Sequence, residues 1–386
     1  MSDDLRYFYS IEASTSHESA FDERTPSEIS LQTDDGETCH LEVFSTTDAI
    51  RMLLNSGLGS VICFTGITFN MILLVMFSRL SFHNTNYLYL YILAFFDIIV
   101  EVCFIMIFSA ATYYEYFYNY ELYVAWHNYI RLFSTVGQVL IIASSVLIVL
   151  ASFERYMCSS SKSPGFDPRT RTLLIFFVIL YAFIVKGTVW AELRLIHAPE
   201  CAKFSDWHIT QSSLADQNSF YYTMWMVHGR NVLCVFLPFS LLCVLNFLTF
   251  RNINRKSKHF EAMLLEGPTM LLPQDAQQAL AARDRKRDAT YTLFALVSVY
   301  LFSNLINTWL TFWEYIDKDG LASIGDGWPY RYLADVSSLT SIAATAFRLP
   351  IYWGCNRELK IHLSTFFNDF TNKKLEKFAL KHEVIV

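Results

Sequence analysis

Charged residues are scarce in this chain. Asp, Glu, Lys and Arg together make up 17% of its 386 residues, whereas hydrophobic residues make up 53%. A soluble domain carries about 25% charged residues, so the composition excludes an ordinary soluble enzyme, a disordered protein and a collagen. The chain also has no Asn-x-Ser/Thr sequence, so N-glycosylation is not expected. Its net charge of −6 gives no indication of nucleic-acid binding.

Catalytic signals are missing as well. The sequence shows no nucleophile–base pair and no His/Cys/carboxylate cluster with metal-ligand spacing. We therefore expect neither an enzyme, nor a resident metal, nor a cofactor.

Long apolar runs are what the chain has instead. Four stretches without any charged residue lie at 53–78, 132–153, 231–250 and 289–313, and three more with few charges lie at 87–112, 172–196 and 333–355. About 18 apolar residues are enough to cross a bilayer as a helix. The sequence therefore predicts an all-α bundle of seven membrane-spanning helices over residues 51–355.

The distribution of Lys and Arg predicts how these helices are oriented. With the N-terminus outside, the inner segments hold 19 basic residues and the outer segments hold 9, as the positive-inside rule requires. Residues 1–50, with twelve acidic residues, are then an extracellular and disordered tail. Residues 356–386 form a cytoplasmic tail that begins with an amphipathic helix for the membrane surface, whose apolar face is Leu359, Leu363, Phe366, Phe367 and Phe370.

Several short motifs occur in order along the predicted spans. They are Gly66-Ile-Thr-Phe-Asn70, Leu93-Ala-Phe-Phe-Asp97, Glu154-Arg155-Tyr156, Pro238 and Pro350. As a set they resemble the rhodopsin-like (class A) G-protein-coupled receptors. The resemblance implies a multi-pass receptor of the plasma membrane that contacts lipid and couples to a heterotrimeric G protein. It also implies that Arg155, held by the adjacent carboxylate in the closed state, reaches the G protein when released.

The family's intramembrane polar network is only partly matched. In the family, the second-span aspartate, here Asp97, binds sodium with a third-span serine, here Ser144; the alternative is a protonated Asp97 bonded to Asn70. Leu349 stands where the family has a polar residue that helps to bind the sodium ion, and Arg348 introduces a positive charge beside it. An unpaired charge inside the membrane is costly. We therefore predict that Arg348 pairs with Asp97, or alternatively with Glu101, in place of a sodium ion.

Other departures concern the third and sixth spans. Ile130 stands where the family has its third-span cysteine, and residues 289–313 contain no proline. This pattern suggests a divergent invertebrate branch, and the FMRFamide-like peptide receptors are the group it resembles.

Gly137 and Gln138 lie at the depth of the third span where the resemblance places the ligand pocket, and they limit the class of ligand that can bind. Gly137 cannot pair with an amine, and the seventh span has no Lys for a Schiff base. The outer segments hold 22 acidic and 9 basic residues and many aromatic ones. These residues suit a cationic, aromatic peptide that ends in an amide, although the acidic residues could equally serve only to keep the outer surface soluble.

A chemosensory receptor for small molecules is the alternative function, and a transporter or channel is a further alternative.

The resemblance also places a cysteine in the second outer loop, which Cys201 matches. Its usual partner is absent at Ile130, and Cys39 is the other cysteine clearly outside the apolar runs. We predict a Cys39–Cys201 disulfide, with two free thiols as the alternative.

Overall fold

The computed structural model describes most of the helical part of the chain. The described residues are 29–32, 38–41, 50, 52–81, 87–160, 165–216, 219–266, 274–316, 328–355, 357, 359–365 and 368.

Seven helical segments cross the bundle, several of them built from consecutive helices. In chain order they are η2 (Leu53–Leu58) with α3 (Gly59–Ser81); α4 (Leu88–Phe104), η4 (Ile105–Ser109) and α5 (Ala110–Phe117); α6 (Tyr120–Ser160); α7 (Pro168–Lys186) with α8 (Val189–Glu192); η6 (Tyr222–Gly229), η7 (Val232–Phe236) and α9 (Leu237–Glu266); α10 (Gln274–Ser303) with α11 (Leu305–Ile316); and α13 (Trp328–Ala346) with α14 (Arg348–Cys355). Among the described residues, six of these segments are long and apolar enough to cross a membrane. The α13–α14 segment, which carries Asp335 and Arg348, completes the seven.

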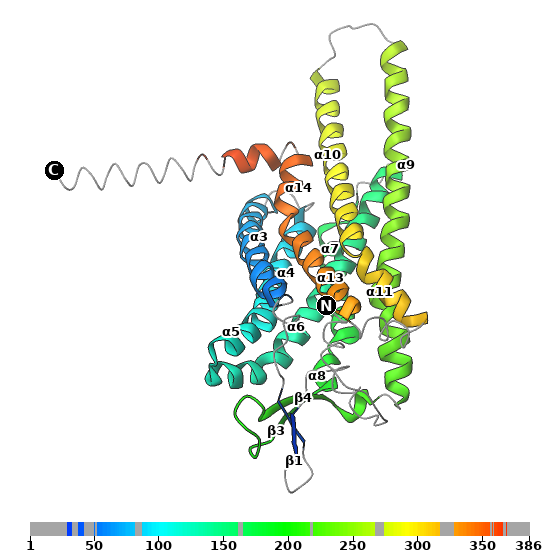
Figure 1. Ribbon diagram of the computed structural model, residues 1–386. Helices are drawn as coiled ribbons and strands as arrows, with labels where there is room; N and C mark the ends of the chain where they lie inside the picture. The colour runs from blue at the N-terminus through cyan, green and yellow to red at the C-terminus, as the bar shows by residue number, and fades with distance from the viewer. Residues whose placement is uncertain are drawn as a thin grey trace, which may run out of the picture.

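Two antiparallel hairpins accompany the helices. β3 (Leu193–His197) pairs with β4 (Trp207–Gln211), with Leu193 opposite Gln211 and His197 opposite Trp207. β1 (Ile29–Gln32) pairs with β2 (Thr38–Leu41) within the acidic tail, where the sequence predicts no structure. In Figure 1, β3 and β4 lie at one end of the bundle, while α9 and α10 project beyond the other helices at the opposite end. We call these the hairpin end and the Arg155 end, because α6 leads from the hairpin to Arg155.

Several helix boundaries differ from the prediction. The third segment starts at Tyr120 rather than near 132, and the fifth starts at Tyr222 rather than at 231. The fourth ends at Glu192, because Leu193–His197 forms strand β3 instead of continuing the predicted span 172–196. Charge-free runs indicate which part of a helix lies in lipid. A helix continues past such a run wherever its polar residues form hydrogen bonds or ion pairs with other parts of the fold.

Both predicted helix prolines lie next to irregular helix geometry. Pro238 is the second residue of α9, and the π-helical turn η7 ends just before it. There the amide of Leu237 donates to the Val232 carbonyl, five residues back. Pro350 is the third residue of α14, and the α-helix is interrupted at Phe347, three residues before it. Because proline has no N–H to donate and crowds the preceding turn, such irregularities are expected beside it.

The sixth segment is interrupted without a proline. Between α10 and α11, the backbone amide and the side-chain amide of Asn304 both donate to the Tyr300 carbonyl, at 3.0 and 2.9 Å. The Ser303 hydroxyl donates to the same oxygen at 2.9 Å. Short polar side chains of this kind compete for the backbone and bend helices, which gives this bundle a bend where the family has a proline.

The helix predicted after the seventh span is present at 359–365 and packs on the bundle. Leu359 and Leu363 are 1% and 2% exposed and join a core cluster with Leu73, Phe77 and Tyr352. In Figure 1 this helix turns away from the direction of α14. Phe366, Phe367 and Phe370, the rest of the predicted apolar face, lie outside the residues whose side chains are described.

Candidate functional site

A cavity of about 120 Å³ lies in the centre of the helix bundle. Its walls come from α4, α6, α7, α10, α11, α13, α14 and the fifth segment. Apolar side chains dominate, and polar ones from facing helices converge among them: Gln138, Ser144, Ser145, Tyr300, Asn307 and Thr308. An apolar cavity with a few polar groups is the usual form of a small-ligand site.

Asp97 and Arg348 form a buried ion pair in the wall of this cavity. Arg348 Nη1 lies 2.5 Å from Asp97 Oδ2, and the two side chains are 8% and 1% exposed. The pairing predicted from the sequence is thus present, with Asp97 rather than Glu101 as the partner. The prediction that this pair takes the place of a sodium ion stays a prediction. Ser144, the third-span serine named with Asp97 in the sequence analysis, also lines the cavity.

Glu101 forms a second polar group one helical turn from Asp97. The Asn70 side-chain amide and the Thr345 hydroxyl both donate to Glu101 Oε1 at 3.0 Å. Glu101 is fully buried, and a side chain at Gly66 would collide with its carboxylate. Both ends of the Gly-x-x-x-Asn motif therefore contact Glu101. Gly66 leaves space for the carboxylate, and Asn70 donates a hydrogen bond to it. Among the described contacts, the Asn70 amide bonds Glu101 and not Asp97, as the alternative would require.

The Glu154-Arg155-Tyr156 motif lies near the Arg155 end of α6, but its carboxylate is bound by another arginine. Arg171, near the start of α7, places its Nη2 2.5 Å from Glu154 Oε1, and the two side chains are 5% and 7% exposed. The Phe166 amide donates to the same oxygen at 3.1 Å. The expectation that Glu154 holds Arg155 is therefore wrong for this conformation, since α7 supplies the cation.

Arg155 faces a smaller cavity at the same end of the bundle. Its walls include Tyr89 from α4, Thr292 from α10 and Tyr352 from α14. Within the described part of the chain, the Arg155 guanidinium forms no salt bridge. Tyr156, the third residue of the motif, is half-buried.

The two residues predicted at the pocket level of the third span differ in their roles. Gln138 lines the central cavity and is 3% exposed. Gly137 is buried but does not line the cavity. Lys186, the last residue of α7, does line it and is 2% exposed. No role was predicted for Lys186, although a lysine inside an apolar run is a sufficient signal for one.

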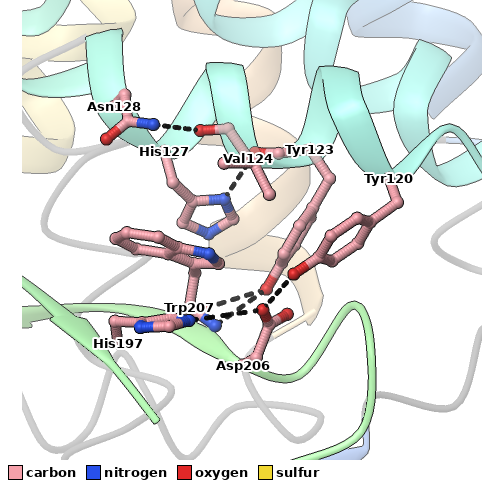
Figure 2. A network of polar contacts seen from close by, with 8 residues as sticks. All are labelled: Tyr120, Tyr123, Val124, His127, Asn128, His197, Asp206 and Trp207. Atoms are coloured by element: carbon pink, nitrogen blue, oxygen red, sulfur yellow. Dashed lines mark hydrogen bonds and ion pairs between the residues drawn. The ribbon is translucent and has the colours of Figure 1, made fainter. Parts of the chain in front are cut away.

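The β3–β4 hairpin is bound to α6 by polar contacts (Figure 2). The Tyr123 hydroxyl donates to the Trp207 carbonyl at 3.0 Å and accepts from the Trp207 amide at 3.3 Å. The Tyr120 hydroxyl donates to Asp206, and His197 Nε2 lies 3.7 Å from the same carboxylate. The third span is therefore joined to the hairpin here without a cysteine at Ile130.

Arg131, one residue after Ile130, makes a further contact at this end. Its guanidinium donates to the Trp190 carbonyl at 2.7 Å and stacks over the Trp190 ring, 4.5 Å from the centroid. These contacts fix α6 against α8, next to the start of the hairpin.

A third buried ion pair joins the fourth and fifth segments. Arg230 Nη1 lies 2.9 Å from Glu192 Oε2, and both side chains are 5% exposed. The Tyr221 hydroxyl donates to Glu192 Oε1 at 2.8 Å, and burial raises the pKa of Tyr221 to about 12, so this hydroxyl keeps its proton. Arg230 and Glu192 are among the 9 basic and 22 acidic residues of the predicted outer segments. Because they neutralise each other inside the bundle, neither attracts a ligand.

The aromatic residues between Tyr113 and Trp126, which belong to the outer segments predicted to face a ligand, fall into two groups. Tyr114, Tyr123 and Trp126 are buried in a core cluster at the hairpin end, and Tyr120 is half-buried against Asp206. The exposed members are Tyr113, Tyr116, Phe117 and Tyr118. The aromatic surface open to a ligand is therefore smaller than the sequence suggests.

Cys201 lies in the turn between β3 and β4 and is disulfide-bonded. The backbone of Cys39 lies in β2, paired with Leu31, but its side chain is outside the described part of the structure. The pairing of these two cysteines therefore stays a prediction.

No protein-family model matches the chain, and no curated protein matches its sequence. The crystal structure of squid rhodopsin is similar to it, with a TM-score of 0.62 and 15% sequence identity. The match covers 84% of this chain and 83% of the rhodopsin chain. Identity at this level shows the fold alone. The chain has the rhodopsin-like seven-helix fold, and this part of the resemblance is confirmed.

Proposed function

We propose that this chain is a plasma-membrane receptor that activates a heterotrimeric G protein, with its N-terminus outside the cell. The observation that carries the proposal is the position of Arg155 in a rhodopsin-like bundle. It lies at the end opposite the hairpin, beside a cavity bordered by five helical segments. A protein element that inserts there would meet a guanidinium with no salt bridge among the described residues.

The contact between Glu154 and Arg171 suggests how the receptor is held at rest. The carboxylate ties α6 to α7, so Arg155 is positioned by the packing around it rather than by its own neighbour. Outward movement of α10, which carries Thr292 and Leu296, would widen the cavity without breaking the Glu154–Arg171 pair. The G protein would then occupy the widened cavity and contact Arg155 and Tyr156.

The ligand we propose is a cationic neuropeptide, of the kind bound by FMRFamide-like peptide receptors. Its support is chemical. Glu115 and Glu121 are exposed at the hairpin end of the bundle, close in sequence to the exposed Tyr116 and Tyr118. Carboxylates and aromatic faces together attract guanidinium and ammonium groups.

A chemosensory receptor for small molecules is the second candidate. The size and burial of the central cavity favour it, because about 120 Å³ accommodates a small organic molecule or one end of a peptide. The two candidates share the fold and the G-protein partner and differ only in the ligand.

The Cys39–Cys201 disulfide belongs to the same proposal. It would tie the acidic tail to the turn between β3 and β4, and so hold the tail beside the entrance for a ligand. The described strand β2 gives Cys39 an ordered backbone from which such a bridge can form.

A peptide screen tests the ligand class. Cells that express the chain with a promiscuous Gα subunit are exposed to peptides of matched length that differ only in Arg or Lys against citrulline or Gln. The proposal predicts calcium responses to the cationic members and weak or absent responses to their neutral analogues. Responses confined to small volatile or lipophilic compounds would support the chemosensory candidate instead.

A further inference from the structure

The end of the loop between α6 and α7 fits closely around the Glu154 carboxylate. The Phe166 amide donates to Glu154 Oε1 at 3.1 Å. Gly165, just before it, has a φ of 97°, a backbone conformation that residues with a side chain rarely adopt. A Cβ atom at Gly165 would also lie 2.8 Å from Glu154 Oε1. A glycine and a free amide therefore stand where the loop has to approach this carboxylate.

Arg171 binds the same carboxylate from the first turn of α7. Its Nη2 and Nε lie 2.5 and 3.1 Å from Glu154 Oε1, and its Nε lies 3.3 Å from Oε2. Both side chains are buried, so solvent screens the two charges little. Charge-assisted hydrogen bonds of this kind are roughly twice as strong as neutral ones. Glu154 is therefore held firmly toward α7.

Arg155 lines the same cavity as this pair. The walls of the smaller cavity at the Arg155 end include Glu154, Arg155 and Arg171. The Glu154 carboxylate is close enough to act on Arg155 electrostatically. Within the described part of the chain, however, the salt bridge of Glu154 is with Arg171. Two arginines thus stand beside one carboxylate, and the arginine of α7 holds it.

We propose that Arg171 is a positioning residue, which keeps Arg155 available to the G protein even without a ligand. The inference rests on the proposed receptor function and adds to it how the Arg155 end is regulated. While α7 holds Glu154, no ion pair of Arg155 with its neighbour has to break before the G protein binds. Without the Arg171 guanidinium, the buried carboxylate would lack its cation, which is strongly unfavourable. Arg155 is then the cation of the same cavity that can replace it.

Nucleotide exchange without a ligand tests this role. Binding of radiolabelled GTPγS to purified heterotrimeric G protein is followed in membranes that hold each variant at equal surface expression. Arg171→Gln should slow exchange by roughly tenfold, because Glu154 then holds Arg155. Arg171→Lys keeps the cation and should retain most of the exchange. Arg169→Gln, at an exposed arginine two residues earlier in α7, is the matched control and should behave as wild type. Unchanged or faster exchange in Arg171→Gln would overturn the proposal.

A double variant separates competition for the carboxylate from damage to the fold. Glu154→Gln removes the group that would hold Arg155, so its addition to Arg171→Gln should restore exchange. If the loss of Arg171 merely damages the contact between α6 and α7, a second substitution at that contact should not repair it. Exchange that stays slow in the double variant would therefore contradict the proposal.

Thermal unfolding of the purified full-length chain in detergent follows the same competition without a G protein. Arg155→Gln should not lower the unfolding temperature of the wild-type chain, where the partner of Glu154 is Arg171. In the Arg171→Gln background, Arg155→Gln should lower the unfolding temperature by several degrees, because it then breaks a buried ion pair. Equal effects of Arg155→Gln in the two backgrounds would rule out the exchange of partners.

The two measurements distinguish this inference from the proposed function. If exchange depends on Arg155 but not on Arg171, the receptor function stands and the positioning role of Arg171 is wrong. If Arg155→Gln lowers the unfolding temperature only in the Arg171→Gln background and no exchange occurs, Arg171 does position Arg155, and the G protein is the wrong partner.

Discussion

Replacing Arg348 by leucine leaves the Asp97 carboxylate without its cation in the middle of the helix bundle. The two side chains are 8% and 1% exposed, so water does little to screen the charge that remains. Breaking a buried pair by removing one partner costs about 3–5 kcal/mol. At about 2–4 °C per kcal/mol for a domain of 150–250 residues, the unfolding temperature in detergent should fall by roughly 6–20 °C. Asp97→Leu should cause a loss of similar size.

The double variant Asp97→Leu/Arg348→Leu separates the pair from ordinary packing. It removes both charges and fills the site with apolar side chains, an exchange that is often neutral or stabilising. We therefore expect it to be more stable than either single variant, with Arg194→Leu, at an exposed position on β3, as the control. If the two single-variant decreases in unfolding temperature simply add in the double variant, the reasoning is refuted.

The unfolding temperature of the wild-type chain should also be the same in sodium chloride and in choline chloride at equal ionic strength.

The remaining predictions concern the hairpin end. Arg230→Leu should lower the free energy of unfolding by about 3–5 kcal/mol, because it leaves Glu192 buried without its cation; equal stability to wild type in chemical denaturation would contradict the assignment. Non-reducing peptide mapping should recover Cys39 and Cys201 in one linked fragment, and Cys39→Ser should release a free thiol at Cys201. Recovery of Cys201 linked to another cysteine, or as a free thiol in the wild-type chain, would remove the proposed bridge.

The seven-helix fold could be predicted because lipid imposes it. Four charge-free runs of 20 residues or more, and three runs with few charges, are costly to expose to water and suited to a bilayer, so the number and order of the spans could be predicted from the sequence. The ends of the helices were not predictable in the same way. Tyr120–Arg131 mixes polar and aromatic residues, and it is helical because Tyr120 and Tyr123 bond the hairpin, which lies over 80 residues later.

Some polar contacts could be predicted from the sequence and others could not. Arg348 and Asp97 could be paired from the sequence, because each is costly alone at the same depth of the membrane. Arg171 and Arg230 were missed as partners of Glu154 and Glu192. Each lies at the edge of an apolar run, where an arginine is usually an ordinary membrane-interface residue. Only the packing of neighbouring helices brings it next to a carboxylate.

Nucleotide exchange tests the central claim most directly. Membranes that contain the wild-type chain, Arg155→Ala or Arg194→Ala at equal surface expression are combined with purified heterotrimeric G protein, and binding of radiolabelled GTPγS is followed over time. Wild type and Arg194→Ala should both accelerate binding above membranes without the chain, since Arg194 is exposed on β3, away from the Arg155 end. Arg155→Ala should return the rate to that background. Exchange that is unchanged by Arg155→Ala, or no acceleration by the wild-type chain with any G-protein subtype, would contradict the account.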